Sequence, residues 1–163
     1  FPYNKEGKLN SEEMDHCYFL IETFDLKNLI YRTYTSLSGG EQQRVQLARS
    51  FAQIWNYDGY DKKLIILDEP TNNLDIKHQL ALFDLIVKLN KKGLTVIIVL
   101  HDLNHAIFYS KTTIMLKDGK LKYYGSTLDT FNENNLQNIF DVNLQVHSVN
   151  DNHKTVVLKD RSY

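Results

Sequence analysis

Helical spacing of apolar residues marks the first third of the chain. Asn10 followed by Glu13 resembles a capping box, which predicts a helix start. The apolar positions that follow share one helical face: Met14, Cys17, Tyr18, Ile21 and Phe24. A second set continues at helical spacing after the run LSGG: Val45, Ala48, Ala52 and Trp55. Two helices are therefore predicted, joined by a short polar stretch at 32–36.

Continuous apolar runs and amphipathic segments alternate in the rest of the chain. The run at 64–67 is typical of a strand buried on both faces of a parallel sheet, and a β-branched run follows at 94–100. Between them, the amphipathic segment 76–92 predicts a helix, with Gly93 at its C-terminal cap. A helix at 102–109, a hairpin about Asp118-Gly119, and short helices and strands in the tail follow. This order indicates an α/β domain with a mainly parallel core sheet.

The composition of the chain adds few constraints on its fold and its partners. The 163 residues are 42% hydrophobic and 24% charged, which is enough apolar material for one core. A net charge of −1 gives no sign of a nucleic-acid or lipid-headgroup partner. The single cysteine, Cys17, fits a reducing cytosol and a small core position on a helix. No apolar run approaches the roughly 20 residues that span a bilayer.

Two carboxylates, Asp68 and Glu69, directly follow the apolar run at 64–67. In parallel sheets, ligands collect at the carboxyl ends of strands. The first carboxylate can hold Mg²⁺, directly or through water, and the second can orient or deprotonate an attacking water. Taken alone, the dipeptide is explained equally well as a charged turn that caps a strand.

Ser38, Gly39 and Gly40 precede the second predicted helix. Glycines let the backbone approach an anion closely, and a helix N-terminus presents N–H groups and positive potential. A plain serine N-cap with a loop glycine is the simpler explanation when these residues are seen in isolation.

His101 ends the second apolar run and precedes Asp102, a plausible helix N-cap. A histidine there could contact a terminal phosphate and the attacking water, or it could be structural. The run HDLNH at 101–105 also resembles the zinc motif H-E-x-x-H. That motif requires both histidines on one helical face, whereas His101 follows a predicted strand and Asp102 shortens the acidic side chain, so zinc is less favoured.

Together these residues resemble the nucleotide-binding subunits of ABC transporters. LSGGEQQR at 37–44 matches the signature motif, LIILDEP at 64–70 the Walker B strand, NNLD at 72–75 the D-loop, and His101 the switch histidine. Order and spacing agree from about residue 1 to about residue 125. Four motifs in register are far more specific than any one of them.

The resemblance implies a P-loop NTPase-like (RecA-like) fold, with a mainly parallel sheet, helices on both faces and a remnant of the ABC helical subdomain. It divides the chain into a helical remnant with the signature motif (1–55), a catalytic α/β core (56–125) and a tail of the same domain (126–163). The implied cofactors are ATP and Mg²⁺.

Roles for single residues follow from the same resemblance. Asp68 would serve Mg²⁺, Glu69 the hydrolytic water and His101 the γ-phosphate, while Asp75 would help to couple two active sites. The signature residues would contact ATP held mainly by a second subunit, in a head-to-tail pair: Ser38, Gly39, Gly40 and Glu41.

The chain also departs from the family pattern. It contains no G-x-x-x-x-G-K-[ST] and no Q-loop glutamine, and its start, Phe1-Pro2-Tyr3, resembles the segment shortly after that glutamine. We therefore expect that the N-terminal third or more of the subunit is absent, although mutational loss of the motif is an alternative. The chain alone should then hydrolyse no ATP and should expose apolar sheet surface.

Shorter runs narrow the subfamily. AQIW at 52–55, HQ at 78–79 and VLHDLN at 99–104 resemble importers of iron complexes and cobalamin, and EQQRVQLAR at 41–49 is most similar to the haemin-import branch. The expected partners are a second ATP-binding subunit, membrane permease subunits and, indirectly, a periplasmic or surface substrate-binding protein. The expected location is the cytoplasmic face of the cell membrane. A soluble ABC-type ATPase of translation or DNA repair is the alternative from another class.

Overall fold

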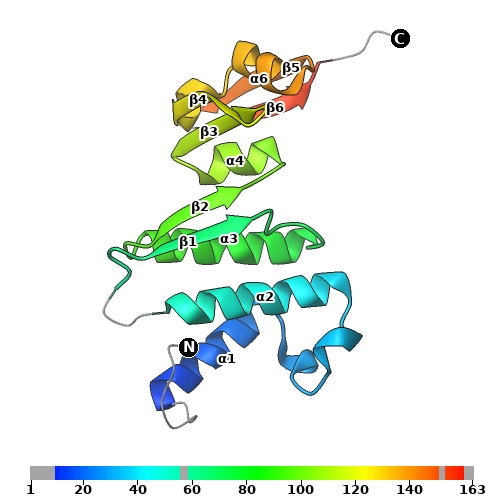
Figure 1. Ribbon diagram of the computed structural model, residues 1–163, viewed down its shortest axis with the longest axis vertical. Helices are drawn as coiled ribbons and strands as arrows, with labels where there is room; N and C mark the ends of the chain where they lie inside the picture. Colours follow the sequence, from blue (N-terminus) through cyan, green and yellow to red (C-terminus); the bar gives the residue numbers. More distant parts are fainter. Residues whose placement is uncertain (1–9, 56–58, 151–152, 160–163) are drawn as a thin grey trace. The chain divides into compact units, whose positions relative to one another are not determined.

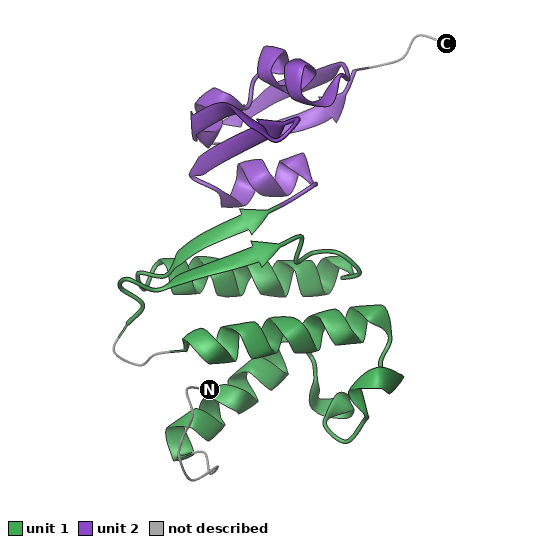
Figure 2. Ribbon diagram, in the orientation of Figure 1, with its two compact units in different colours: residues 1–99 green, residues 100–163 purple. Residues whose placement is uncertain are grey.

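The computed structural model describes residues 10–55, 59–150 and 153–159. The chain splits into two compact units, residues 1–99 and residues 100–163 (Figure 2). The start at Phe1-Pro2-Tyr3 lies outside the described residues, and the division into the segments 1–55, 56–125 and 126–163 stays a prediction.

The first unit begins with the predicted helices. Helix α1 (Ser11–Thr23) starts with the expected capping box, in which Asn10 Oδ1 accepts from the Glu13 N–H at 2.8 Å and Glu13 Oε2 accepts from the Asn10 N–H at 2.8 Å. Two 3₁₀ turns, η1 (Lys27–Leu29) and η2 (Tyr34–Ser36), lead to helix α2 (Gly39–Ile54). Both helix predictions are confirmed.

Strand β1 (Leu64–Asp68), helix α3 (Ile76–Asn90) and strand β2 (Thr95–Val99) form the parallel part of this unit (Figure 1). The two strands pair in register, from Leu64 with Thr95 to Asp68 with Val99. Helix α3 ends earlier than predicted, and Gly93 follows with a φ of 99°, a conformation that glycine adopts without steric cost.

The prediction that β1 is buried on both faces is wrong. Ile65 and Leu67 are each 6% exposed, but Leu64 and Ile66 on the opposite face are 48% and 64% exposed. The physical reason is that, within the first unit, helix α3 packs on one face of the β1–β2 pair and the opposite face is left exposed. The unit therefore exposes apolar sheet surface, as expected.

The core of the first unit joins α1, α2, α3 and the covered face of the sheet. Phe24 stacks on Phe51 with ring centroids 6.0 Å apart. Of the predicted α1 face, Met14 and Tyr18 are exposed, because α1 buries a narrower stripe than the pattern suggests. The other large residues that anchor this core are Leu20, Tyr60, Leu82, Phe83, Leu89 and Leu94.

The second unit contains the predicted hairpin and tail. Its elements are α4 (Leu103–Tyr109), β3 (Thr112–Lys117), β4 (Lys120–Ser126), α5 (Thr127–Thr130), α6 (Glu133–Phe140), β5 (Leu144–Asn150) and β6 (His153–Leu158). Asp118 and Gly119 have φ values of 53° and 68°, and positive φ at both central residues is what a two-residue hairpin turn of type I′ requires. Both β3–β4 and β5–β6 are antiparallel, so β1–β2 is the parallel pair within the described part of the chain.

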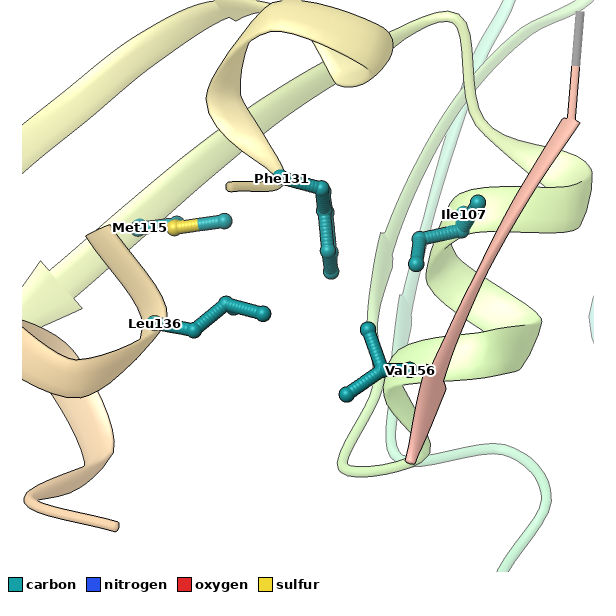
Figure 3. Packing of buried hydrophobic residues seen from close by; sticks show 5 residues of the cluster. All are labelled: Ile107, Met115, Phe131, Leu136 and Val156. Atoms are coloured by element: carbon teal, nitrogen blue, oxygen red, sulfur yellow. The ribbon is translucent and has the colours of Figure 1, made fainter. Parts of the chain in front are cut away.

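An apolar cluster holds the second unit together. Figure 3 shows its five side chains pointing toward one another: Ile107, Met115, Phe131, Leu136 and Val156. Tyr123 packs against this cluster, whereas Tyr124 is 68% exposed. The cluster joins α4, the hairpin, α6 and β6 into one core.

Candidate functional site

The start of helix α2 is capped by its own side chains. Ser38 Oγ accepts from the Glu41 N–H at 3.4 Å, and Glu41 Oε2 accepts from the Ser38 N–H at 2.7 Å. The hydrogen bond from the Ser38 backbone lowers the pKa of Glu41, and Arg32 lies 3.0 Å from the same carboxylate. The LSGG run therefore begins its helix as an ionised capping box.

Gly40 packs closely against another part of the same unit. A Cβ at this position would lie 2.6 Å from the Asn73 carbonyl oxygen, whereas one at Gly39 would lie 4.0 Å from Asn73 Cγ. The sequence suggested that these glycines admit an anion. The structure adds a different requirement at Gly40, which is space for the backbone of the 72–75 segment.

Asp68 and Glu69 lie where β1 ends. Asp68 is an exposed strand residue paired with Val99, and the Glu69 N–H donates to the Val99 carbonyl at 3.2 Å. Glu69 has a φ of 45°, and strained backbone of this kind gathers at functional sites. Asn72 Nδ2 donates to Glu69 Oε2 at 2.6 Å. The carboxylate thus has a fixed neighbour that sequence reasoning missed.

Side-chain amides from two helices hold the loop that follows. Gln43 Nε2 on α2 donates to the Pro70 carbonyl at 3.2 Å. Gln79 Nε2 on α3 donates to the Leu74 carbonyl at 3.0 Å. The loop therefore lies fixed between the signature helix and α3. The sequence offered no signal for these contacts beyond the presence of the glutamines.

Asp75 is the N-cap of α3. Its Oδ1 accepts from the His78 N–H at 2.9 Å and lies 2.7 Å from His78 Nδ1. The hydrogen bond from the His78 backbone lowers the pKa of Asp75. The side chain is thus an ionised helix cap in the segment that contacts Gly40.

His101 belongs to the second unit, whereas the other candidate residues belong to the first. It is exposed and precedes Asp102, whose Oδ1 caps α4 by accepting from the His105 N–H at 2.8 Å. Because α4 begins at Leu103, His101 lies outside the helix, and the H-E-x-x-H arrangement is not formed.

The expected Mg²⁺ would need oxygen ligands near the end of β1. Within residues 10–55, 59–150 and 153–159, no group of three or more His, Cys, Asp or Glu side chains could hold a metal ion. Mg²⁺ usually keeps several waters and takes one or two carboxylates together with substrate phosphates. The exposed carboxylate of Asp68 fits that mode.

None of the described helices combines the length and apolar character needed to cross a membrane.

Comparison with known proteins defines the class. Residues 3–72 match the ABC transporter family model. The chain is 38% identical over 141 residues to the petrobactin import ATP-binding protein FpuC of Bacillus anthracis, covering 86% of this chain and 49% of that protein. It is 43% identical over 115 residues to the hemin import ATP-binding protein HmuV of Aliivibrio fischeri, covering 71% and 43%. It is 39% identical over 132 residues to the vitamin B12 import ATP-binding protein BtuD of Pectobacterium atrosepticum, covering 81% and 53%.

Solved structures agree. An ABC transporter of the metal-chelate type in an inward-facing conformation matches with a TM-score of 0.66 and 26% identity, covering 93% of this chain and 60% of that one. The bacterial ABC transporter cassette MJ0796, solved as a dimer, matches with a TM-score of 0.61 and 31% identity, covering 74% and 50%. The fold is that of the P-loop ATPases of ABC transporters, which confirms the predicted fold class.

Residues 3–72 match the ABC transporter family, and the chain is similar in sequence and fold to ATP-binding subunits of ABC transporters. It spans about half the length of the curated relatives it matches.

Proposed function

We propose that this chain is part of an ATP-binding subunit that powers an ABC importer. The observation that carries the proposal is the packing of three family motifs on one another in the first unit. Gly40 of the signature run lies against Asn73 of the D-loop, and Asn72 of that loop holds Glu69 of the Walker B segment. A loop packed between these motifs suits a site in which nucleotide contacts and water activation must move together.

The proposed roles of the site residues are those that the resemblance to the ABC transporter ATPases implies. Asp68 offers a carboxylate to Mg²⁺, and Glu69 orients or deprotonates the hydrolytic water. His101 senses the γ-phosphate. Asp75 couples two active sites through the 72–75 segment, at whose end it lies. ATP with Mg²⁺ supplies the phosphoryl group whose hydrolysis drives transport.

The signature residues act on a second subunit. Ser38, Gly39, Gly40 and Glu41 contact ATP that is held mainly by the other member of a head-to-tail pair. Membrane permease subunits and, indirectly, a periplasmic or surface substrate-binding protein complete the importer. The subunit lies at the cytoplasmic face of the cell membrane. MJ0796, solved as a dimer, supports the paired arrangement.

Haemin is the proposed cargo, followed by a ferric siderophore and then cobalamin. Relatives named for import of hemin, petrobactin and vitamin B12 are all similar to this chain, which supports the group more strongly than any one member. Residues 1–163 alone are proposed to be inactive, because they contain no G-x-x-x-x-G-K-[ST] loop to cradle the β- and γ-phosphates.

The test uses the natural protein that carries this chain, at its full length, purified together with its membrane partner and reconstituted in vesicles. ATP-dependent uptake of haemin, a ferric siderophore and cobalamin is measured side by side. We expect uptake of haemin above the other two, and none without ATP. Preferred uptake of another cargo would overturn the assignment of haemin as the cargo. ATP hydrolysis that depends on ribosomes or DNA rather than on a membrane partner would overturn the proposal of an importer.

A further inference from the structure

His78 occupies an unusual position between two carboxylates. Its side chain is 12% exposed. Nδ1 lies 2.7 Å from Asp75 Oδ1, and Nε2 lies 3.8 Å from Asp25 Oδ2. Nε2 is buried and makes no hydrogen bond within the described part of the chain. One ring therefore lies between the α3 cap and the turn after α1, which are far apart in the sequence.

The turn at Asp25 is itself anchored. Arg44 Nη1 on α2 donates to the Asp25 carbonyl at 2.6 Å and to the Phe24 carbonyl at 2.8 Å. Lys77 Nζ donates to Asp25 Oδ2 at 3.0 Å, and that hydrogen bond lowers the pKa of Asp25. The turn thus provides His78 with a fixed, ionised carboxylate on its Nε2 side.

The chemistry of Asp75 determines which ring nitrogen carries a proton. Because its pKa is lowered, Asp75 is an ionised carboxylate near neutral pH and can only accept hydrogen bonds. The 2.7 Å contact therefore requires Nδ1–H as the donor. Asp75 Oδ1 thus accepts two hydrogen bonds, one from the His78 backbone N–H and one from the ring Nδ1–H, and the second adds to the restraint on the carboxylate.

We propose that His78 is a positioning residue that ties the orientation of the Asp75 carboxylate to the turn after α1. Asp75 ends the 72–75 segment that packs against Gly40. A shift of the turn at Asp25 therefore reaches this segment through one imidazole ring. The kinetic consequence rests on the proposed ATPase function, whereas the ring contact does not.

The contact is tested on the 163-residue chain by long-range ¹H–¹⁵N NMR of the imidazole rings. We expect His78 to carry a proton on Nδ1, and we expect that proton to exchange faster in Asp75→Ala. Asp25→Asn should change the Nε2 signal, while Glu22→Gln, an exposed neighbour on α1, should leave it unchanged. A neutral ring protonated on Nε2 alone would overturn the proposal.

The kinetic consequence is tested with paired variants of the full-length protein. An asparagine amide can take the place of Nδ1, whereas a glutamine amide lies nearer to Nε2, so His78→Asn keeps the donor to Asp75 and His78→Gln removes it. We expect His78→Gln to lower kcat about fivefold with an unchanged KM for ATP, and His78→Asn to restore most of it. Equal loss in both variants, or a rise in KM alone, would overturn the positioning role. If the parent protein hydrolyses no ATP, the proposed function fails and the NMR result alone decides whether His78 positions Asp75.

Discussion

The loop at 69–75 in the first unit and the apolar cluster of the second unit are held in opposite ways. The loop is fixed by amide and carboxylate side chains, among them Asn72 and Gln43. The cluster has no polar member and is fixed by close packing of buried groups such as Phe131 and Leu136. Directional hydrogen bonds can be exchanged at small free-energy cost, whereas a packed core resists change. The loop therefore depends on a few directional hydrogen bonds, whereas the cluster depends on packing that is shared among all of its members.

The largest loss of stability is expected from a substitution in the apolar cluster of the second unit. Phe131 is 2% exposed, so Phe131→Ala should leave a cavity and lower the free energy of unfolding of the second unit by about 3–5 kcal/mol. Urea denaturation followed by hydrogen exchange of the β5–β6 amides measures this loss. The control is Leu121→Ala on the exposed face of the hairpin, at 62% exposure, which should change it by less than about 0.5 kcal/mol. Similar losses in both variants would contradict the cluster as the core of this unit.

A smaller effect is expected where the loop meets α2. Gly40→Ala places a methyl group 2.6 Å from the Asn73 carbonyl oxygen, so helix or loop must shift, at about 1–3 kcal/mol. Gly39→Ala is the matched control, because its Cβ meets only Asn73 Cγ at 4.0 Å. Thermal unfolding of both variants measures the difference. Equal melting temperatures would show that the close approach does not constrain the loop.

The smallest expected effect is the pH dependence of the stability that the Asp75 cap gives to α3. The pKa of Asp75 is lowered by its hydrogen bond from the His78 backbone, so the ionised cap stabilises α3 above about pH 4, the usual aspartate value. That stabilisation is lost as pH falls through the lowered native value. Asp75→Asn keeps a capping oxygen without a titrating group. The protection factor of the His78 amide, which is its exchange rate relative to the intrinsic rate at the same pH, should therefore fall more on acidification in the parent than in Asp75→Asn, and an identical fall would refute the assignment.

Much of the fold was predictable because local signals agree with it. The capping pairs at Asn10 and Ser38, the Asp118-Gly119 turn and the apolar runs all formed the predicted elements. Burial of β1 was predicted wrongly, because an apolar run reports the tendency of a strand to be covered and does not reveal whether a covering element is present. Leu64 and Ile66 show this directly.

The residues of the candidate site also divide into those that the sequence predicts and those that it does not. The positions of Asp68, Glu69 and Asp75 at strand and helix ends were predictable because short motifs mark them, and their functional roles stay predictions. Asn72, Gln43 and the Asp25–His78 contact were missed, because each depends on tertiary geometry between elements or on side-chain direction in a loop. A glutamine or asparagine has too many ordinary roles for sequence alone to single it out.

The proposed role of Glu69 is to activate the water that hydrolyses ATP in a paired ATPase. The most direct measurement is nucleotide retention by the full-length protein carrying Glu69→Gln, with Glu22→Gln as an exposed control on α1. Glu69→Gln should bind Mg-ATP, fail to hydrolyse it and elute from size exclusion as a dimer that retains ATP, while the control turns over normally. Unchanged hydrolysis in Glu69→Gln would contradict the account.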